Sequence, residues 1–323
     1  MKEALFYTKL EDQKVRCELC PHNCIISSGN IGICRARKNI SGVLYAINYG
    51  ETISISIDPM EKKPLYHFHP GKSIISIGPN SCNFSCKFCQ NYQSSQFEVP
   101  TTTITPGKLL DLCKLHLCDF AAFTYTEPTT WFEFILDSAK LLKENSIKTV
   151  MVTNGFINQE PLKKLLPYID AMNIDLKAFD DKFYRNICNG SLQPVLETIK
   201  TASKHCHIEI TNLIITDEND SEKQINDLVD FIADINPNIP LHFSRYYPTF
   251  KMENPATSVA TLQMAKEIAE KKLKYVYLGN IVTERNTCCP NCDQLLIRRD
   301  FPFNNDILDG KCPSCGYIIY GEF

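Results

Sequence analysis

The cysteines offer the most chemistry in this sequence, because most of the sixteen fall into three tight groups. Short spacings between cysteines, in a chain without a secretion signal, predict metal sites instead of disulfides. The groups are Cys17, Cys20, Cys24 and Cys34; Cys82, Cys86 and Cys89; and Cys289, Cys292, Cys312 and Cys315.

The central group lies in the segment GPNSCNFSCKFCQN, with the spacing C-x3-C-x2-C. Three thiolates can hold three irons of a four-iron cube and leave the fourth iron open to a methionine-like ligand. Zinc would need a fourth ligand, and no Cys or His occurs between Cys89 and Cys113. The spacing therefore predicts an oxygen-sensitive [4Fe–4S] cluster. A three-cysteine zinc site completed from a distant segment is the alternative.

The spacings of the other two groups predict different metal sites. CPNC and CPSC are paired knuckles separated by 19 residues, a spacing that predicts a four-cysteine zinc ribbon. The Cys-Pro register favours Cys289 over Cys288 as the first ligand. The N-terminal spacing, C-x2-C-x3-C-x9-C, fits a zinc site or a second iron–sulfur cluster, and we favour zinc.

Short apolar segments alternate with amphipathic helices between these groups. Helices are predicted from Pro106 after a Thr105 N-cap, over 129–144 and over 221–234. Strict alternation of strand and helix predicts an α/β fold with a parallel sheet. The predicted strands are 73–78, 119–126, 149–154, 171–177, 207–215, 240–244 and a weaker 275–279.

About six such repeats predict a partial (β/α)6 TIM-like barrel over residues 71–281. Residues 1–70 and 282–323 break the alternation, so we expect an N-terminal Cys-rich metal-binding module and a C-terminal zinc-ribbon module. His67 and His69, in EKKPLYHFHPG ahead of the first barrel strand, either cover the active site or belong to a linker.

Polar side chains gather where the predicted strands end, and in a parallel barrel the chemistry lies at that end. Glu127 follows the second strand, and Thr153 and Asn154 end the third. A helix-start turn is the structural alternative for Glu127. The fourth strand carries Asn173, Asp175 and Lys177 on one face of NIDLK; a structural ion pair is the alternative there.

Later strands carry a second polar set, which we expect to face a substrate more than a cofactor. Glu209 and Thr211 share a face of HIEITNL, and His242 and Ser244 share a face of LHFS. Arg245 follows directly. The candidate catalytic residues are therefore Glu209, His242 and Arg245, with purely structural roles as the alternative.

The central loop resembles the signature of the radical S-adenosylmethionine (SAM) superfamily, C-x3-C-x-aromatic-C, with Phe88 in the aromatic place. The sequence is also similar to pyruvate formate-lyase activating enzyme, and it most resembles the radical SAM member of the AmmeMemoRadiSam system. That resemblance runs nearly end to end. Its segments are RCELCPHNC, EKKPLYHFHPG, CNFSCKFCQNYQ, TYTEPTTWFEF, VTNGF, NIDLKAF, LHFSRYYP and the CPNC/CPSC pair.

This resemblance implies one-electron reduction of the cluster and cleavage of SAM to methionine and a 5′-deoxyadenosyl radical, which takes a hydrogen atom from a substrate. It implies that Phe88 packs near the adenine and that Asp175 and Lys177 lie near the methionyl group and ribose. Glu127 takes the place of the glutamate that holds the SAM amino group, with Tyr125 and Thr126 where the family has two glycines. The implied partners are an electron donor of the ferredoxin or flavodoxin type and Memo-like and AMMECR-type proteins.

Composition excludes several other classes of protein. A net charge of -3 and a pI near 6.2, with no long basic run, argue against nucleic-acid binding. No apolar run reaches 18 residues and the N-terminus is not a signal peptide, which predicts a cytoplasmic protein without membrane contact. We expect a radical SAM enzyme acting on a small molecule. The alternatives are a glycyl-radical-enzyme activase and, more remotely, a zinc-dependent scaffold protein.

Overall fold

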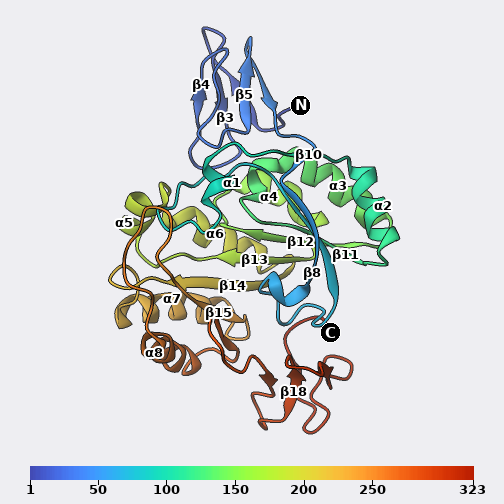
Figure 1. Cartoon of the computed structure of the whole chain (residues 1–323), viewed down its shortest axis with the longest axis vertical. Coiled ribbons are helices and arrows are strands. Elements are labelled where there is room, and N and C mark those ends of the chain that lie inside the picture. Colours follow the sequence, from blue (N-terminus) through green and yellow to red (C-terminus); the bar gives the residue numbers. More distant parts are fainter.

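A computed structural model describes every residue from Met1 to Phe323, and its centre is an eight-stranded sheet (Figure 1). The strand order is β16-β15-β14-β13-β12-β11-β9-β8. Seven strands run parallel to their neighbours, and the eighth, β8 (Ser54–Pro59), runs antiparallel to β9. The sheet is open, because β8 and β16 form its two edges and do not pair with each other.

Each parallel strand overlaps a segment that the sequence predicts as a strand, so the predicted α/β fold with a parallel sheet is confirmed. The strongest signal is that of β9, whose last five residues are all buried, as in a strand covered on both faces. The strands are β9 (Ser73–Gly78), β11 (Phe120–Phe123), β12 (Lys148–Thr153), β13 (Ala171–Asp175), β14 (His207–Ile214), β15 (Leu241–Arg245) and β16 (Val276–Gly279).

Helices connect these strands, and two of the three predicted ones begin where the sequence predicts, while the helix predicted over 129–144 begins at Phe132, after a 3-10 turn. The Thr105 hydroxyl accepts a hydrogen bond from the Lys108 amide, and Ser221 does the same for Gln224, so both act as N-caps. The helices are α1 (Tyr92–Gln96), α2 (Pro106–Leu115), α3 (Phe132–Glu144), α4 (Gln159–Leu165), α5 (Asp181–Phe183), α6 (Leu192–Ala202), α7 (Glu222–Ile235) and α8 (Val259–Glu270). No helix combines the length and the apolar character needed to cross a lipid bilayer.

Two small modules lie at opposite ends of the molecule (Figure 1). The N-terminal one contains two three-stranded antiparallel sheets. The C-terminal one contains a third such sheet. The strands are β1 (Lys2–Glu3), β6 (Val43–Ala46) and β5 (Arg37–Ile40); β2 (Tyr7–Lys9), β3 (Val15–Cys17) and β4 (Ile25–Ile26); and β17 (Thr287–Cys288), β18 (Leu295–Arg298) and β19 (Asn304–Asn305). A further pair joins β7 (Glu51–Thr52) to β10 (Thr102–Thr103).

The segment between β8 and β9 lies at the end of the sheet where the parallel strands begin. His69 donates its backbone N–H to the Glu322 carbonyl at 2.7 Å, and Glu322 in turn forms an ion pair with Lys148, the first residue of β12. His67 is fully buried and contacts Tyr320. The chain therefore uses this histidine-containing segment and its C-terminal tail to close the end opposite the carboxyl ends of the strands. Of the two alternatives for this segment, the one in which it covers the active site is therefore not supported.

Candidate radical SAM site

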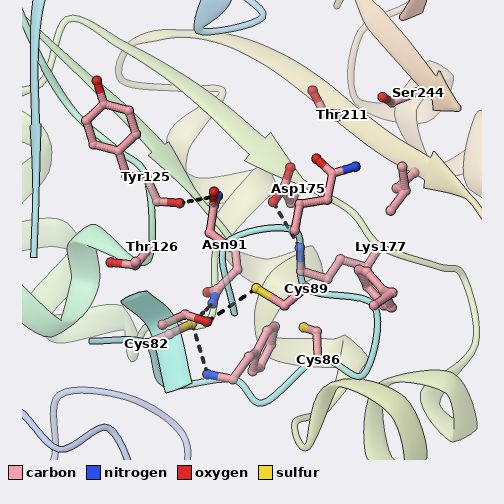
Figure 2. A pocket seen from close by; sticks show the side chains of 16 residues that line it. Cys82, Cys86, Cys89, Asn91, Tyr125, Thr126, Asp175, Lys177, Thr211 and Ser244 are labelled. Carbon is pink, nitrogen blue, oxygen red and sulfur yellow. Dashed lines mark hydrogen bonds and ion pairs between the residues drawn. The ribbon is translucent and has the colours of Figure 1, made fainter. Parts of the chain in front are cut away.

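The central cysteine loop leaves β9 at Gly78 and folds over the carboxyl ends of the parallel strands. Gly78 has to be a glycine, since a Cβ there would lie 2.1 Å from the Thr124 carbonyl oxygen on the neighbouring strand. Beyond it, Cys82, Cys86 and Cys89 all face one pocket (Figure 2). The sequence prediction that these three thiols act together is consistent with this placement.

The pocket brings together side chains from the cysteine loop and from the ends of five parallel strands, β11 to β15. The pocket is open to solvent, and its empty volume, counted out to the solvent, is about 850 Å³. Its lining residues are Cys82, Phe84, Cys86, Phe88, Cys89, Gln90, Asn91, Ser95, Tyr125, Thr126, Asn154, Asp175, Lys177, Thr211, Leu213 and Ser244.

The three thiols have the chemistry of an iron–sulfur ligand set. The Phe84 amide points at the Cys82 sulfur at 3.4 Å, and the Ser95 hydroxyl lies 3.3 Å from the Cys89 sulfur. A hydrogen bond with the Cys188 thiol lowers the pKa of Cys86, against the effect of burial. Hydrogen bonds to sulfur stabilise thiolates and tune such clusters. Cys188 contacts Cys86 but does not line the pocket, and no histidine lines it, so the three thiols that face the pocket fit a cluster with one open iron better than a closed zinc site.

Asp175 and Lys177 stand on the wall of the pocket opposite the cysteines (Figure 2). The Lys177 ammonium lies 2.9 Å from the Asp175 carboxylate and 5.7 Å from the centre of the Phe88 ring. Burial disfavours the charged ammonium, but the Asp175 carboxylate raises the pKa of Lys177 well above its ordinary value. The pair is therefore ionic, and it presents both charges to the pocket.

Glu127 is placed differently from its sequence-based role, because it does not line the pocket. It is fully buried, and both its carboxylate oxygens are occupied by donors of the protein. Thr129 donates its N–H at 2.8 Å and Thr153 its hydroxyl at 2.7 Å to one oxygen, and the Asn154 N–H donates to the other at 2.8 Å. Burial raises the pKa of Glu127, while these donors oppose the shift. Glu127 therefore fixes the end of β12, and its assignment as a direct SAM contact is not supported.

The neighbours of Glu127 divide into a pocket residue and a buried one. Asn154 lines the pocket, and its amide donates to Asn83 at 2.9 Å and lies 3.9 Å from the Cys82 sulfur. Thr153 points away from the pocket toward Glu127 and is buried. Of the two residues that end the predicted third strand, only Asn154 can contact a ligand.

Tyr125 and Thr126 line the pocket at the places where the resembled family has glycines. Tyr125 adopts a φ of 77°, a left-handed conformation that costs a non-glycine residue about 1–3 kcal/mol. Its carbonyl accepts a hydrogen bond from Asn91 at 2.9 Å, and its hydroxyl contacts Asp58 at 3.2 Å. The backbone thus keeps a conformation suited to glycine, and contacts of the ring hold it there.

The two remaining candidates, Asn173 and Arg245, are held by contacts within the protein and do not line the pocket. Asn173 is buried, donates a hydrogen bond to the Pro64 carbonyl at 2.8 Å and accepts one from the Thr211 hydroxyl at 2.9 Å. It therefore supports the pocket residue Thr211 and does not face the pocket itself. Arg245 donates to the Thr257 carbonyl at 2.7 Å and to the Tyr247 hydroxyl at 3.1 Å, which ties it to the loop after β15.

Glu209 and His242, predicted to face a substrate, are buried in a polar cluster near the starts of their strands. Glu209 accepts hydrogen bonds from His242 at 2.6 Å, from His207 at 3.1 Å and from the His67 backbone at 2.6 Å. These imidazoles lower the pKa of Glu209 despite its burial. Neither Glu209 nor His242 lines the pocket, since the segment around His67 closes that end of the sheet. Their assignment as substrate contacts is therefore not supported.

Several pocket residues were not predicted as site residues. Gln90 and Asn91 come from the turn directly after the third cysteine, and Ser95 comes from α1, which follows that turn, so all three could have been found by that adjacency. Thr211 and Ser244, which the sequence predicts to face a substrate, do line the pocket near the carboxyl ends of β14 and β15, together with Leu213. Their alternation with outward residues marks the right face of each strand, but only the fold fixes how far along it the pocket lies.

The C-terminal cysteines form a compact site, with all four sulfurs within 4.8 Å of one another. The Cys289 sulfur lies 3.6 Å from that of Cys315, and the Cys292 sulfur lies 3.7 Å from that of Cys312. Cys288 is exposed and takes no part, as the Cys-Pro register predicts. The cluster can bind one metal ion.

Comparisons with known proteins agree with this geometry. A profile of the radical SAM superfamily matches residues 76–232. The uncharacterized protein MJ0808 of Methanocaldococcus jannaschii is 45% identical over 333 residues, which span 99% of this chain and 99% of that protein. The pyruvate formate-lyase 1-activating enzyme of Escherichia coli K12 is 28% identical over 106 residues, which span 32% of this chain and 43% of that enzyme. The structure of a radical SAM methyltransferase from Sphaerobacter thermophilus aligns over 71% of each chain with 13% identity and a TM-score of 0.51.

The chain belongs to the radical SAM superfamily. Membership implies an enzyme that makes radicals, with a [4Fe–4S] cluster, SAM and a donor of electrons. Its relatives include activating enzymes of glycyl-radical enzymes, such as the 4-hydroxyphenylacetate decarboxylase activating enzyme of Clostridium scatologenes, which is 25% identical over 34% of this chain and 36% of that enzyme.

Proposed function

We propose that this chain reductively cleaves SAM at a cluster on Cys82, Cys86 and Cys89, and removes a hydrogen atom from a small-molecule substrate. The observation that carries the proposal is one pocket that joins three thiols to the Asp175–Lys177 ion pair. When bound, the cluster and SAM supply a 5′-deoxyadenosyl radical. The scaffold we propose for this chemistry is the partial barrel formed by the parallel strands.

The chain's own residues would bind and orient SAM. Asp175 can accept hydrogen bonds from the ribose hydroxyls or the amino group, while Lys177 keeps the carboxylate ionised and directed into the pocket. Phe88 is buried against Phe183 and offers the side of its ring to the adenine. Asn154, fixed from behind by Glu127, holds its amide beside Cys82.

The wall made by β14 and β15 would receive the substrate. Thr211 and Ser244 are small, and neither they nor Leu213 carry a charge, so this wall offers two hydroxyl groups and one apolar contact. Such a surface suits a small molecule with hydroxyl or carbonyl groups and without a charge at this point. The resemblance to the AmmeMemoRadiSam system also favours a small molecule, and it implies Memo-like and AMMECR-type partner proteins.

A second candidate is a glycyl-radical-enzyme activase, whose substrate is a backbone glycine of another protein. The names of two relatives, which activate pyruvate formate-lyase and 4-hydroxyphenylacetate decarboxylase, favour it. The sheet is open between β8 and β16, as entry of a peptide loop would require.

One experiment separates the two candidates. Reduced enzyme and SAM are incubated with cell extract divided by a filter into small molecules and proteins, and 5′-deoxyadenosine is measured. Stimulation by the small-molecule fraction, in step with substrate consumed, supports the first proposal. Stimulation by the protein fraction alone, with a persistent glycyl radical in electron paramagnetic resonance, supports the activase. A Cys86→Ala variant is the matched control and should give no signal with either fraction.

We also propose zinc as the ion of the C-terminal cysteines. A Zn–S bond of about 2.3 Å places tetrahedral thiolates about 3.8 Å apart, and the observed 3.6 and 3.7 Å agree with this spacing. The site is closed by four thiolates, and its sheet packs on Tyr66 and Tyr277 of the main body. Its role would therefore be structural.

A further inference from the structure

The four N-terminal cysteines surround a second pocket, next to the radical SAM site. Cys17 ends β3, Cys20 and Cys24 lie in the turn to β4, and Cys34 lies in the turn before β5. All four line the same small pocket, whose empty volume, counted out to the solvent, is about 370 Å³. The four thiols therefore share one small space within the N-terminal module.

The spread of these sulfurs does not suit one zinc ion. In the C-terminal group all four sulfurs lie within 4.8 Å of one another, and that group is the only one in the chain with three or more such ligand atoms so close. The N-terminal sulfurs are therefore farther apart than four thiolates on a single ion, which sit about 3.8 Å from each other. A four-iron cube needs a wider arrangement, because each thiolate binds a different iron.

Two buried donors at this pocket have no acceptor in the protein. The Nε of Arg37 and the hydroxyl of Thr129 are buried without a hydrogen-bond partner, and both residues line the pocket. Arg37 is held in place by Glu133, whose carboxylate oxygen lies 2.6 Å from its Nη1. Bridging sulfides and thiolates accept hydrogen bonds, so a cluster would give both donors an acceptor. The positive charge of Arg37 would in turn offset part of the negative charge of the cluster.

The N-terminal pocket shares a wall with the radical SAM site. The Nε2 of His22, between Cys20 and Cys24 in sequence, lies 2.7 Å from the Asn83 carbonyl oxygen. Asn83 lines the N-terminal pocket and follows Cys82 directly. Its side chain also contacts Asn154 in the SAM pocket at 2.9 Å. One layer of residues therefore separates the two sites.

We propose that Cys17, Cys20, Cys24 and Cys34 hold a second [4Fe–4S] cluster that passes electrons to the cluster on the central loop. Four thiolates leave no open iron, which excludes substrate binding at the cluster and fits a one-electron carrier. In each transfer the N-terminal cluster takes one electron from a low-potential protein donor of the ferredoxin or flavodoxin class and gives it to the central cluster. No bond and no proton changes place. The transfer step rests on the proposed function, whereas the cluster assignment does not.

The surface around this site suits contact with such a donor. Cys24 and Cys34 are half-buried, whereas Cys17 and Cys20 are buried. Beside the two half-buried cysteines, Ile25 and Ile33 are 61% and 56% exposed. An apolar surface therefore lies beside the N-terminal site, and Asn83 connects that site to Cys82.

Metal analysis of the full chain tests the cluster assignment. The triple variant Cys82→Ala, Cys86→Ala and Cys89→Ala, reconstituted anaerobically with iron and sulfide, should keep about four irons in a cluster whose spectrum does not respond to SAM. The double variant Cys20→Ala/Cys34→Ala should lose the irons of the N-terminal site and keep the SAM-responsive cluster on the central loop. Circular dichroism checks that both variants fold. A folded triple variant with no iron and about two zinc ions would overturn the assignment.

Electron transfer is tested by stopped-flow reduction with a reduced flavodoxin. In the wild type the central cluster should be reduced in a fast phase, and the variant Cys20→Ala and Cys34→Ala should lose that phase. Dithionite, a small reductant, should still reduce the central cluster of this variant. Cys315→Ala, which damages only the C-terminal site, is the control and should keep the fast phase. An unchanged fast phase without the N-terminal cysteines would refute the transfer, while the SAM-responsive cluster would still support the proposed function.

Discussion

Glu127→Gln separates a residue that binds SAM from one that positions the pocket. All three neighbours of Glu127 are donors, so the carboxylate form fits the site. The glutamine carbonyl can keep the bonds from Thr129 and Thr153, but its NH2 group then faces the Asn154 N–H. One buried donor is left without an acceptor, which should cost about 1–3 kcal/mol of stability. The direct effect on SAM should be small, because no carboxylate oxygen reaches the pocket.

The assay is anaerobic thermal unfolding together with equilibrium binding of labelled SAM. We expect the melting temperature to fall by several degrees, iron content to stay the same, and SAM affinity to change only slightly. Glu160→Gln, on the exposed surface of α4, is the matched control and should change neither quantity. An unchanged melting temperature with SAM affinity lowered about tenfold or more would refute this reasoning, because loss of a hydrogen bond to a charged ligand has that size.

Three further predictions concern other parts of the molecule. Asp175→Asn should lower SAM affinity about tenfold or more while the irons stay bound, since it removes the one carboxylate of the pocket; binding as tight as in the wild type would make the ion pair structural. Cys315→Ala should release one zinc ion and leave the iron content unchanged, as measured by elemental analysis; loss of iron instead would contradict the zinc assignment. Burial lowers the pKa of His67 from 6.5 to about 3, so as the pH falls the unfolded chain takes up a proton before the folded one does. The free energy of unfolding should therefore fall by up to about 1.4 kcal/mol per pH unit below 6.5. Chemical denaturation between pH 7 and 5 should show that this dependence of unfolding free energy on pH is weaker in His67→Asn.

The sequence predicts the sheet well because each parallel strand is a short, nearly continuous apolar run between capped helices. β9 matches its predicted bounds, and Thr105 and Ser221 cap helices as expected. The small N-terminal sheets were not predicted. Their strands have two to four residues, too few to show alternation.

The candidate site shows where sequence reasoning fails. Alternation identifies the inward face of β14, with Glu209, Thr211 and Leu213, but it does not say which of these lies at the pocket. Depth along the strand decides this, and the other end is closed by His67 and the C-terminal tail, which are far from β14 in sequence. The role of Glu127 is likewise decided by contacts that the sequence pattern does not reveal, because its three hydrogen-bond donors come from the end of β12 and from its own turn.

The most direct test of the central claim is the measurement of 5′-deoxyadenosine from anaerobically reconstituted enzyme, SAM and a low-potential reductant. We predict that the full chain forms 5′-deoxyadenosine and methionine. The Cys86→Ala variant should form neither product, although its C-terminal cysteines should still bind their metal ion. Equal 5′-deoxyadenosine formation by the wild type and by Cys86→Ala would contradict the assignment of the cluster to the central loop.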